Sequence, residues 1–158
     1  MSLQAIEGII YQVVQVEKAG AEFYCKLAAS VPIEAAREVF QRLADDEVRH
    51  QKDFADLGAT VQGRGLSLES AVNLVEVMST AVQKVQAAMK GSELVNMDGV
   101  SLRQALDIGI QNEQEAIRVY SELLTIKNPE FNMIVKKIIE EEQKHFAILK
   151  NLKAHRLA

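Results

Sequence analysis

The feature that most constrains this chain is a short pattern of glutamate and histidine that occurs twice. Glu47 stands three residues before His50, and Glu142 stands three residues before His145, in a sequence that contains only three histidines. A shift of 95 residues superimposes the two pairs. A single Glu-x-x-His on a helix is weak evidence, because such pairs commonly form solvated surface contacts. Its repetition in both halves of the chain requires a common cause.

The repeat extends upstream of each pair. A shift of 96 residues places Glu17 on Glu113 and Tyr24 on Tyr120. Each half therefore contains a glutamate, a tyrosine seven residues later, a turn marked by a proline, and then Glu-x-x-His. This order indicates an internal repeat of one helical hairpin.

Apolar residues recur at three- and four-residue steps through most of the chain, which is typical of amphipathic helices. The predicted helices cover about residues 3–30, 32–57, 101–127 and 129–155, with a further periodic segment at 70–89. Pro32 and Pro129 are predicted to begin helices, and Gly58 to end one. Ser101 and Gln104 fit a capping box at the start of the third of these four helices.

We expect one all-α domain over residues 1–158. It comprises a hairpin at 3–57, a crossover at 58–99 that contains the additional helix, and a second hairpin at 100–155. A chain of 158 residues, 48% apolar and 25% charged, has the size and composition of a single globular domain. No alternation of apolar and polar residues is long enough to predict a strand.

Composition excludes several classes of partner. The net charge is −4 with dispersed Lys and Arg, so neither nucleic acid nor an anionic membrane is an expected partner. No signal peptide and no apolar run of about 20 residues is present, and we expect a cytoplasmic protein. The single cysteine, Cys25, suits a reducing compartment, cannot complete a four-cysteine metal site, and is expected to be a small buried residue.

The spacing of the repeat places its glutamates at one level. Each of the four glutamates lies 13 to 15 residues from its hairpin turn, which is roughly 20 Å along a helix. Each histidine, three residues after a glutamate, projects from the same face. Two hairpins packed together would therefore collect four carboxylates and two imidazoles at the centre of a bundle.

Such a cluster predicts a pair of metal ions. Four buried carboxylates repel one another, and each costs several kcal/mol to remove from water. Two divalent cations balance four carboxylates, and mixed carboxylate and imidazole ligands favour iron, manganese or zinc over calcium or magnesium. The predicted ligands are Glu17, Glu47, His50, Glu113, Glu142 and His145.

Three further residues are candidates for hydrogen bonds to the ligands. Tyr24 and Tyr120 lie two turns after a predicted ligand glutamate and can either bond to a ligand or serve as core aromatics with a satisfied hydroxyl. Asp46 precedes Glu47 and can either accept a bond from a ligand or lie solvated at the surface.

At these residues the sequence resembles the rubrerythrin branch of the ferritin-like di-iron carboxylate proteins, over about residues 3–152. The resemblance implies a ferritin-like four-helix bundle of two hairpins joined by a long crossover. It also implies two iron ions, for which manganese or zinc could substitute. Full rubrerythrins carry a rubredoxin module with two Cys-x-x-Cys pairs, which this sequence lacks. The resemblance therefore implies a separate electron donor, such as a rubredoxin-like protein.

A second departure concerns one ligand position. Rubrerythrins tend to carry an additional ligand glutamate one turn after the residue that matches Glu113, and here that position is Ala116. The remaining set of four glutamates and two histidines also resembles bacterioferritin centres.

The resemblance implies a non-haem di-iron oxidoreductase that reduces hydrogen peroxide or O₂. Glu47 and Glu142 would bridge the metals, Glu17 and Glu113 would be terminal ligands, and each histidine would bind one metal. No catalytic residue beyond the ligands is assigned. The alternatives are a ferroxidase or iron-handling protein of bacterioferritin type, and a di-iron hydroxylase of an organic substrate. We expect a homodimer, with or without exchange of hairpins.

Overall fold

A computed structural model describes residues 3–62, 83, 101–125 and 129–156. It contains the helices α1 (Leu3–Ser30), α2 (Glu34–Gln62), α4 (Leu102–Leu123) and α5 (Pro129–Arg156). These residues include no strand, which confirms the predicted all-α class. The predicted helix at 70–89 lies outside the described residues apart from position 83.

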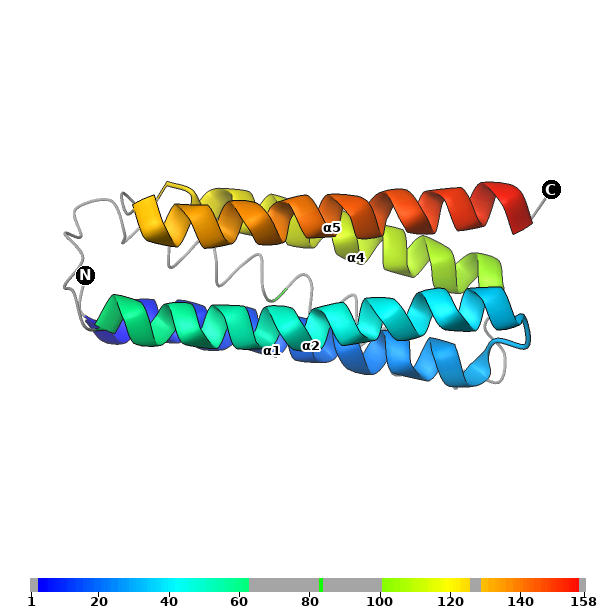
Figure 1. The fold of residues 1–158 in the computed structure, drawn as a ribbon, viewed down its shortest axis with the longest axis horizontal. Helices are drawn as coiled ribbons and strands as arrows, with labels where there is room; N and C mark the ends of the chain where they lie inside the picture. Colours follow the sequence, from blue (N-terminus) through cyan, green and yellow to red (C-terminus); the bar gives the residue numbers. More distant parts are fainter. Residues whose placement is uncertain (1–2, 63–82, 84–100, 126–128, 157–158) are drawn as a thin grey trace.

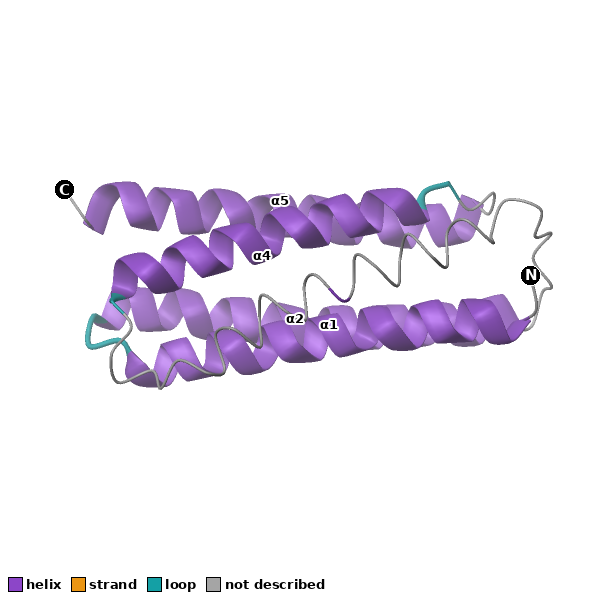
Figure 2. Ribbon diagram, turned by 180° about the vertical axis from the view of Figure 1, so that it is seen from behind, coloured by secondary structure: helices purple, strands orange, loops and turns teal. Residues whose placement is uncertain are grey.

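The four helices form two antiparallel hairpins that lie lengthwise against each other. Figure 1 shows α1 beside α2 and α4 beside α5, with the two hairpin turns at opposite ends of the bundle. Figure 2 shows the same arrangement from behind. The end of α2 and the start of α4 lie at opposite ends of the bundle. This arrangement confirms the predicted ferritin-like four-helix bundle.

The turn of the first hairpin differs from the sequence prediction. The second helix begins at Glu34 rather than at Pro32, which lies in a bend. A proline disfavours the helical conformation of the residue before it, here Val31, so Pro32 ends α1 instead of starting α2. The carbonyl of Ile33 then accepts the first backbone hydrogen bonds of α2, at 3.0 Å.

The predicted end of α2 near Gly58 is also wrong, because the helix continues to Gln62. Five residues assigned to the crossover therefore belong to α2. A Cβ atom at Gly58 would lie 2.9 Å from Cγ2 of Ile10, closer than real Cβ atoms approach other side chains. The glycine thus permits close contact between α1 and α2, a role that its sequence position does not reveal.

The second hairpin begins as predicted. Ser101 caps α4 through its side chain, which accepts from the Gln104 amide, while the Gln104 side chain accepts from the Ser101 amide at 3.0 Å. This reciprocal pair is the predicted capping box. The helix α5 begins at Pro129, where the missing amide hydrogen costs no helical hydrogen bond.

The end of α4 comes earlier than predicted, at Leu123 instead of about residue 127. Thr125 forms a tight turn, because its amide and its hydroxyl both donate to the Glu122 carbonyl, at 3.2 and 2.8 Å. The hydroxyl of a threonine near a helix end competes for backbone carbonyls in this way.

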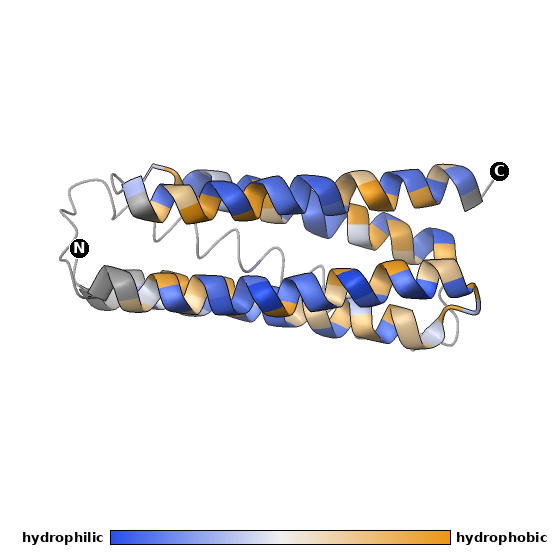
Figure 3. Ribbon diagram, in the orientation of Figure 1, coloured by the Kyte–Doolittle hydropathy of each residue, from blue (hydrophilic) through white to orange (hydrophobic). Residues whose placement is uncertain are grey.

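The interior has two apolar clusters separated along the bundle by a polar layer. In Figure 3 hydrophobic residues recur along each helix between hydrophilic ones. The first cluster includes Ile9, Val13, Phe54, Val119, Leu123, Phe131 and Ile138, and the second includes Phe23, Leu27, Phe40, Leu43, Leu106 and Leu149. Every helix contributes to both clusters, so each helix crosses the polar layer between them.

Two further expectations concern exposure and membranes. Cys25 is exposed, so its expected burial is wrong. Its position on α1 falls between the buried residues Tyr24 and Leu27, on the outward side of the helix.

Within the described residues, no helix is both long and apolar enough to cross a membrane.

The contact at Gly58 generates a test of helix packing. Alanine favours a helix over glycine by about 1 kcal/mol, but at Gly58 the added methyl meets the stiff side chain of Ile10. We expect G58A to lower the free energy of unfolding by roughly 1 kcal/mol. At Gly8 an added Cβ meets nothing within 4 Å, so G8A should be neutral or stabilising. Urea denaturation of both metal-free variants tests this contrast, and equal stabilisation would contradict the packing role of Gly58.

Candidate metal centre

The polar layer between the two apolar clusters contains every predicted ligand. The buried polar side chains of the described helices are Glu17, Glu47, His50, Asn112, Glu113, Glu142 and His145. Six of these seven are the predicted ligands, and each is at most 5% exposed. Because burial of bare charge is costly, a concentration of all buried charged groups at one level indicates a site and not a packing accident.

The six side chains form two groups that each can hold a metal ion. The first group is Glu17, Glu47, His50 and Glu142, and the second is Glu47, Glu113, Glu142 and His145. Within each group the ligand atoms lie within 4.8 Å of one another. Glu47 and Glu142 belong to both groups, which is the position expected of bridging ligands.

The carboxylate oxygens divide between the two groups in a regular way. Nδ1 of His50 lies 3.0 Å from Oε1 of Glu142 and 3.6 Å from Oε2 of Glu47. Nδ1 of His145 lies 3.0 Å from Oε2 of Glu142 and 3.7 Å from Oε1 of Glu47. Each shared carboxylate thus turns one oxygen to each histidine, as a carboxylate that bridges two cations would.

The terminal glutamates complete the groups. Oε2 of Glu17 lies 3.5 Å from Nδ1 of His50, and Oε2 of Glu113 lies 3.8 Å from Nδ1 of His145. The two imidazole rings are nearly parallel, with an interplanar angle of 23° and centroids 5.7 Å apart. The two halves of the repeat therefore build two similar half-sites side by side.

The outer nitrogen of each histidine bonds to a carboxylate of the other hairpin. Nε2 of His145 donates to Asp46 at 3.2 Å, and Nε2 of His50 donates to Glu141 at 2.9 Å. A carboxylate only accepts, so these bonds keep the proton on Nε2 and leave Nδ1 to face the centre. Asp46 was a sequence candidate. Glu141 was missed, although the 95-residue shift places Asp46 on it.

Arg49 joins these two outer carboxylates. Its guanidinium contacts Asp46 at 2.8 Å and Glu141 at 2.9 Å, and its side chain is half exposed. Burial favours the neutral form of Glu141, but hydrogen bonds from His50 and Arg49 outweigh it and lower the pKa of Glu141 to about 2. The carboxylate therefore stays charged and able to orient His50 at neutral pH. Sequence reasoning did not identify Arg49.

Both candidate tyrosines bond to a terminal glutamate of the opposite hairpin. The Tyr24 hydroxyl donates to Oε1 of Glu113, and the Tyr120 hydroxyl donates to Oε1 of Glu17. The seven-residue offset in the sequence suggested a bond between each tyrosine and the glutamate of its own helix. In the structure each tyrosine bonds instead to the glutamate of the other hairpin. Both phenols are fully buried, and burial together with the neighbouring carboxylates raises their pKa well above 10, so they remain donors.

Without metal, protons have to replace the missing positive charge. Burial and the nearby Glu47 raise the pKa of Glu17 to about 8, and burial with Glu142 raises that of Glu113. Burial alone lowers the pKa of an imidazole, but the surrounding carboxylates outweigh it and raise the pKa of both His50 and His145. Metal binding at neutral pH should therefore release protons.

The residues present fit a metal pair. His50 Nδ1 and Glu142 Oε1 are buried and lie 3.0 Å apart as an ion pair, but neither atom has a well-directed hydrogen bond within the described structure. Buried polar atoms without a well-directed hydrogen bond require an explanation such as an ion. The mixed carboxylate and imidazole donors suit iron, manganese or zinc.

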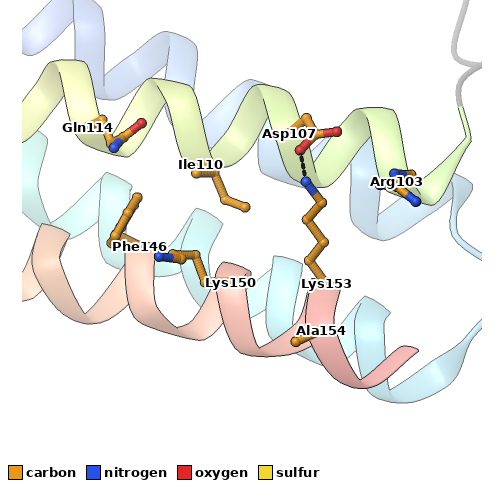
Figure 4. A pocket seen from close by; sticks show the side chains of 8 residues that line it. All are labelled: Arg103, Asp107, Ile110, Gln114, Phe146, Lys150, Lys153 and Ala154. Atoms are coloured by element: carbon orange, nitrogen blue, oxygen red, sulfur yellow. Dashed lines mark hydrogen bonds and ion pairs between the residues drawn. The ribbon is translucent and has the colours of Figure 1, made fainter. Parts of the chain in front are cut away.

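A small cavity adjoins the clustered residues, and a larger hollow lies elsewhere on the bundle. A cavity of about 20 Å³ is lined by Glu17, Glu47, Glu113, both tyrosines, Val16, Gly20, Asn112 and Ala116. A larger hollow of about 510 Å³ lies between α4 and α5, where Lys153 pairs with Asp107 (Figure 4). None of the six clustered residues lines the larger hollow.

The bundle and its buried cluster define a ferritin-like protein whose buried carboxylates and imidazoles could hold a metal. The model of the rubrerythrin family matches residues 9–153, and the chain belongs to this family. The search of curated proteins and the search of solved structures found no match. Family and cluster together indicate a metal site, most simply for iron. The ligand assignment of each residue stays a prediction.

The shared position of Glu47 and Glu142 generates the first test of the site. In E47Q/E142Q the amides nearly preserve side-chain volume but remove the repulsion. We expect the metal-free variant to remain folded, because relief of carboxylate repulsion offsets the lost pairs with His50 and His145. Excess Mn²⁺ or Fe²⁺ should stabilise wild type by roughly 4 kcal/mol at a thousandfold excess over the dissociation constant, and the variant far less.

The control is E38Q/E140Q, which changes two exposed glutamates on the same helices. It should respond to metal as wild type does. Calorimetry with and without metal separates the cases. If E47Q/E142Q melts much lower without metal and responds fully to metal, the two glutamates are not ligands.

The outer carboxylates generate a second test. D46A/E141A leaves the six predicted ligands in place but removes the groups that bond to Nε2 of both imidazoles. We expect two metal ions to bind still, with affinity reduced roughly 10- to 100-fold. D45A/E140A, which changes the preceding residues, should bind as wild type does. Competition with a chromophoric chelator measures both affinities. Equal affinity in the two variants would contradict the role of Asp46 and Glu141 in orienting the imidazoles.

Proposed function

We propose that this protein is a non-haem di-iron oxidoreductase of rubrerythrin type that reduces hydrogen peroxide or O₂. The observation that carries the proposal is the pair of buried four-residue groups that share Glu47 and Glu142. When bound, two ferrous ions would supply the two electrons that such a reduction requires. Reduction of one peroxide to two waters also consumes two protons, which have to come from solvent or from the site.

The protein's own contribution is ligand geometry and charge balance. Glu17 and Glu113 are proposed as terminal ligands, each held by a tyrosine hydroxyl of the opposite hairpin. His50 and His145 are proposed to bind one ion each through Nδ1, oriented by the carboxylates on Nε2. With one oxygen from each carboxylate, four side chains per ion leave coordination positions open to a small molecule.

The small cavity supports an oxidant over an organic substrate. Its volume of about 20 Å³ accommodates one water-sized group. Gly20 and Ala116 face it from α1 and α4, one turn after the two terminal glutamates. Ala116 therefore contributes space where rubrerythrins tend to carry an additional ligand. A hydroxylase would need an apolar pocket at the cluster, and the larger hollow contains none of the clustered residues.

Two partners belong to the proposed function, an electron donor and a second copy of the chain. We propose a separate electron donor, such as a rubredoxin-like protein, because the sequence contains one cysteine and hence no rubredoxin motif. We also propose a homodimer. The ferroxidase alternative of bacterioferritin type requires a large hollow shell for storage, so assembly size separates it from the oxidoreductase.

Reaction with oxidants tests the proposed function. Protein loaded anaerobically with Fe²⁺ is mixed in a stopped-flow instrument with peroxide or with O₂, and the near-ultraviolet absorption of ferric iron is followed. We expect oxidation of both irons by one equivalent of peroxide, and re-reduction by a reduced rubredoxin. H50A/H145A should lose the reaction.

Light scattering provides the second measurement. A dimer mass is expected, and a large hollow oligomer that accumulates hundreds of irons would favour storage instead. Oxidation by neither peroxide nor O₂ in fully loaded protein would contradict the proposal.

A further inference from the structure

Asn112 is the one buried polar side chain of the described helices that is not among the six clustered residues. It is 5% exposed, and neither its Nδ2 nor its Oδ1 has a hydrogen-bond partner in the described structure. Buried amide groups almost always have partners, and an unpartnered one in a native protein usually marks a site for water, an ion or a ligand. The side chain therefore requires a partner that the described residues do not supply.

The amide lines the small cavity beside the cluster. Glu17, Glu47 and Glu113 line the same cavity, so whatever enters it meets three of the predicted ligands and the amide at once. The hydroxyls of the two tyrosines that line it are already committed to Glu17 and Glu113. Among the described lining residues, Asn112 is thus a side chain whose donor has no partner.

Asn112 also breaks the symmetry of the site. The 96-residue shift that superimposes the terminal glutamates places Val16 on Asn112, and both residues are buried and line the cavity. The first half of the repeat fills this position with a valine, so packing does not require a polar residue there. The asparagine is explained by a ligand that needs hydrogen bonds on one side of the cavity.

The chemistry of the amide selects the ligand. Its NH₂ group donates and its oxygen accepts, so one ligand oxygen that does both satisfies it. Hydrogen peroxide and water both donate and accept, whereas O₂ cannot donate. The volume of about 20 Å³ accommodates one such oxygen.

We propose that Asn112 is a positioning residue that hydrogen-bonds one oxygen of hydrogen peroxide in this cavity, and so favours peroxide over O₂. The inference rests on the proposed function and names the oxidant that it prefers. The amide takes no part in electron transfer, and it acts by holding the oxidant against the carboxylate cluster.

The test compares N112V, which copies the residue of the first half, with the control Q111V on the exposed side of the same helix. Anaerobically iron-loaded proteins are mixed with peroxide and, separately, with O₂. We expect the second-order rate constant for peroxide to fall roughly five- to tenfold in N112V, the effect of one hydrogen bond. The rate constant for O₂ should stay within about twofold of wild type, and Q111V should change neither rate.

Two readouts without turnover separate positioning from structure. Metal-free N112V should melt at or above the wild-type temperature, because it loses an unpartnered buried amide, and it should bind the same number of Mn²⁺ ions. N112S and N112A provide a second pair that differs in one oxygen. The serine variant should retain more of the peroxide rate than the alanine variant.

The outcomes distinguish this inference from the proposed function. If wild type reacts with peroxide and N112V reacts equally fast, the inference is wrong and the function stands. Equal slowing toward both oxidants, with a lower melting temperature of the metal-free protein, would assign Asn112 a structural role and also overturn the inference. Failure of wild type to react with peroxide would overturn the inference, and failure to react with either oxidant would remove the proposed function as well.

Discussion

Repulsion among four carboxylates withdrawn from water governs this bundle. Glu17, Glu47, Glu113 and Glu142 lie in one layer between two apolar clusters, and only positive charge makes that layer tolerable. In the absence of metal, protons neutralise part of the layer, because burial and the nearby Glu47 raise the pKa of Glu17 to about 8. Apolar packing at both ends fixes the layer, so the cluster cannot escape to solvent without loosening the core. Burial of the site and stability of the fold therefore depend on the same packing.

The site also joins the two halves of the molecule. Its long-range hydrogen bonds run between hairpins: Tyr24 to Glu113, Tyr120 to Glu17, His50 to Glu141, and His145 to Asp46. Arg49 closes the outer edge of the layer by contacting carboxylates of both hairpins. Because the groups that bond to Glu17, Glu113 and both histidines come from the opposite hairpin, metal binding by these residues would be coupled to docking of the hairpins. A change that separates the hairpins should weaken the site even when all six clustered residues remain.

The fold and the six clustered residues were predictable because periodicity and repetition are properties of the sequence itself. The level of each glutamate follows from its distance to a turn, which depends only on the helical rise. Glycine and proline predicted the ends of helices less well. Gly58 lies inside α2, where it permits contact with Ile10 of α1, and Pro32 precedes α2. Glu141 was within reach through the 95-residue shift from Asp46. The crossed tyrosine bonds and the unpartnered Asn112 were not, because they depend on how the hairpins are placed in space.

Iron-edge anomalous diffraction from crystals grown anaerobically with Fe²⁺ tests the central claim most directly. The claim is that the six residues form one dinuclear centre shared through Glu47 and Glu142. It predicts two anomalous peaks in each bundle, roughly 3.5–4 Å apart, each beside Nδ1 of one histidine and both in contact with Glu47 and Glu142. A single peak at full loading, or iron bound only outside the buried layer, would contradict the account.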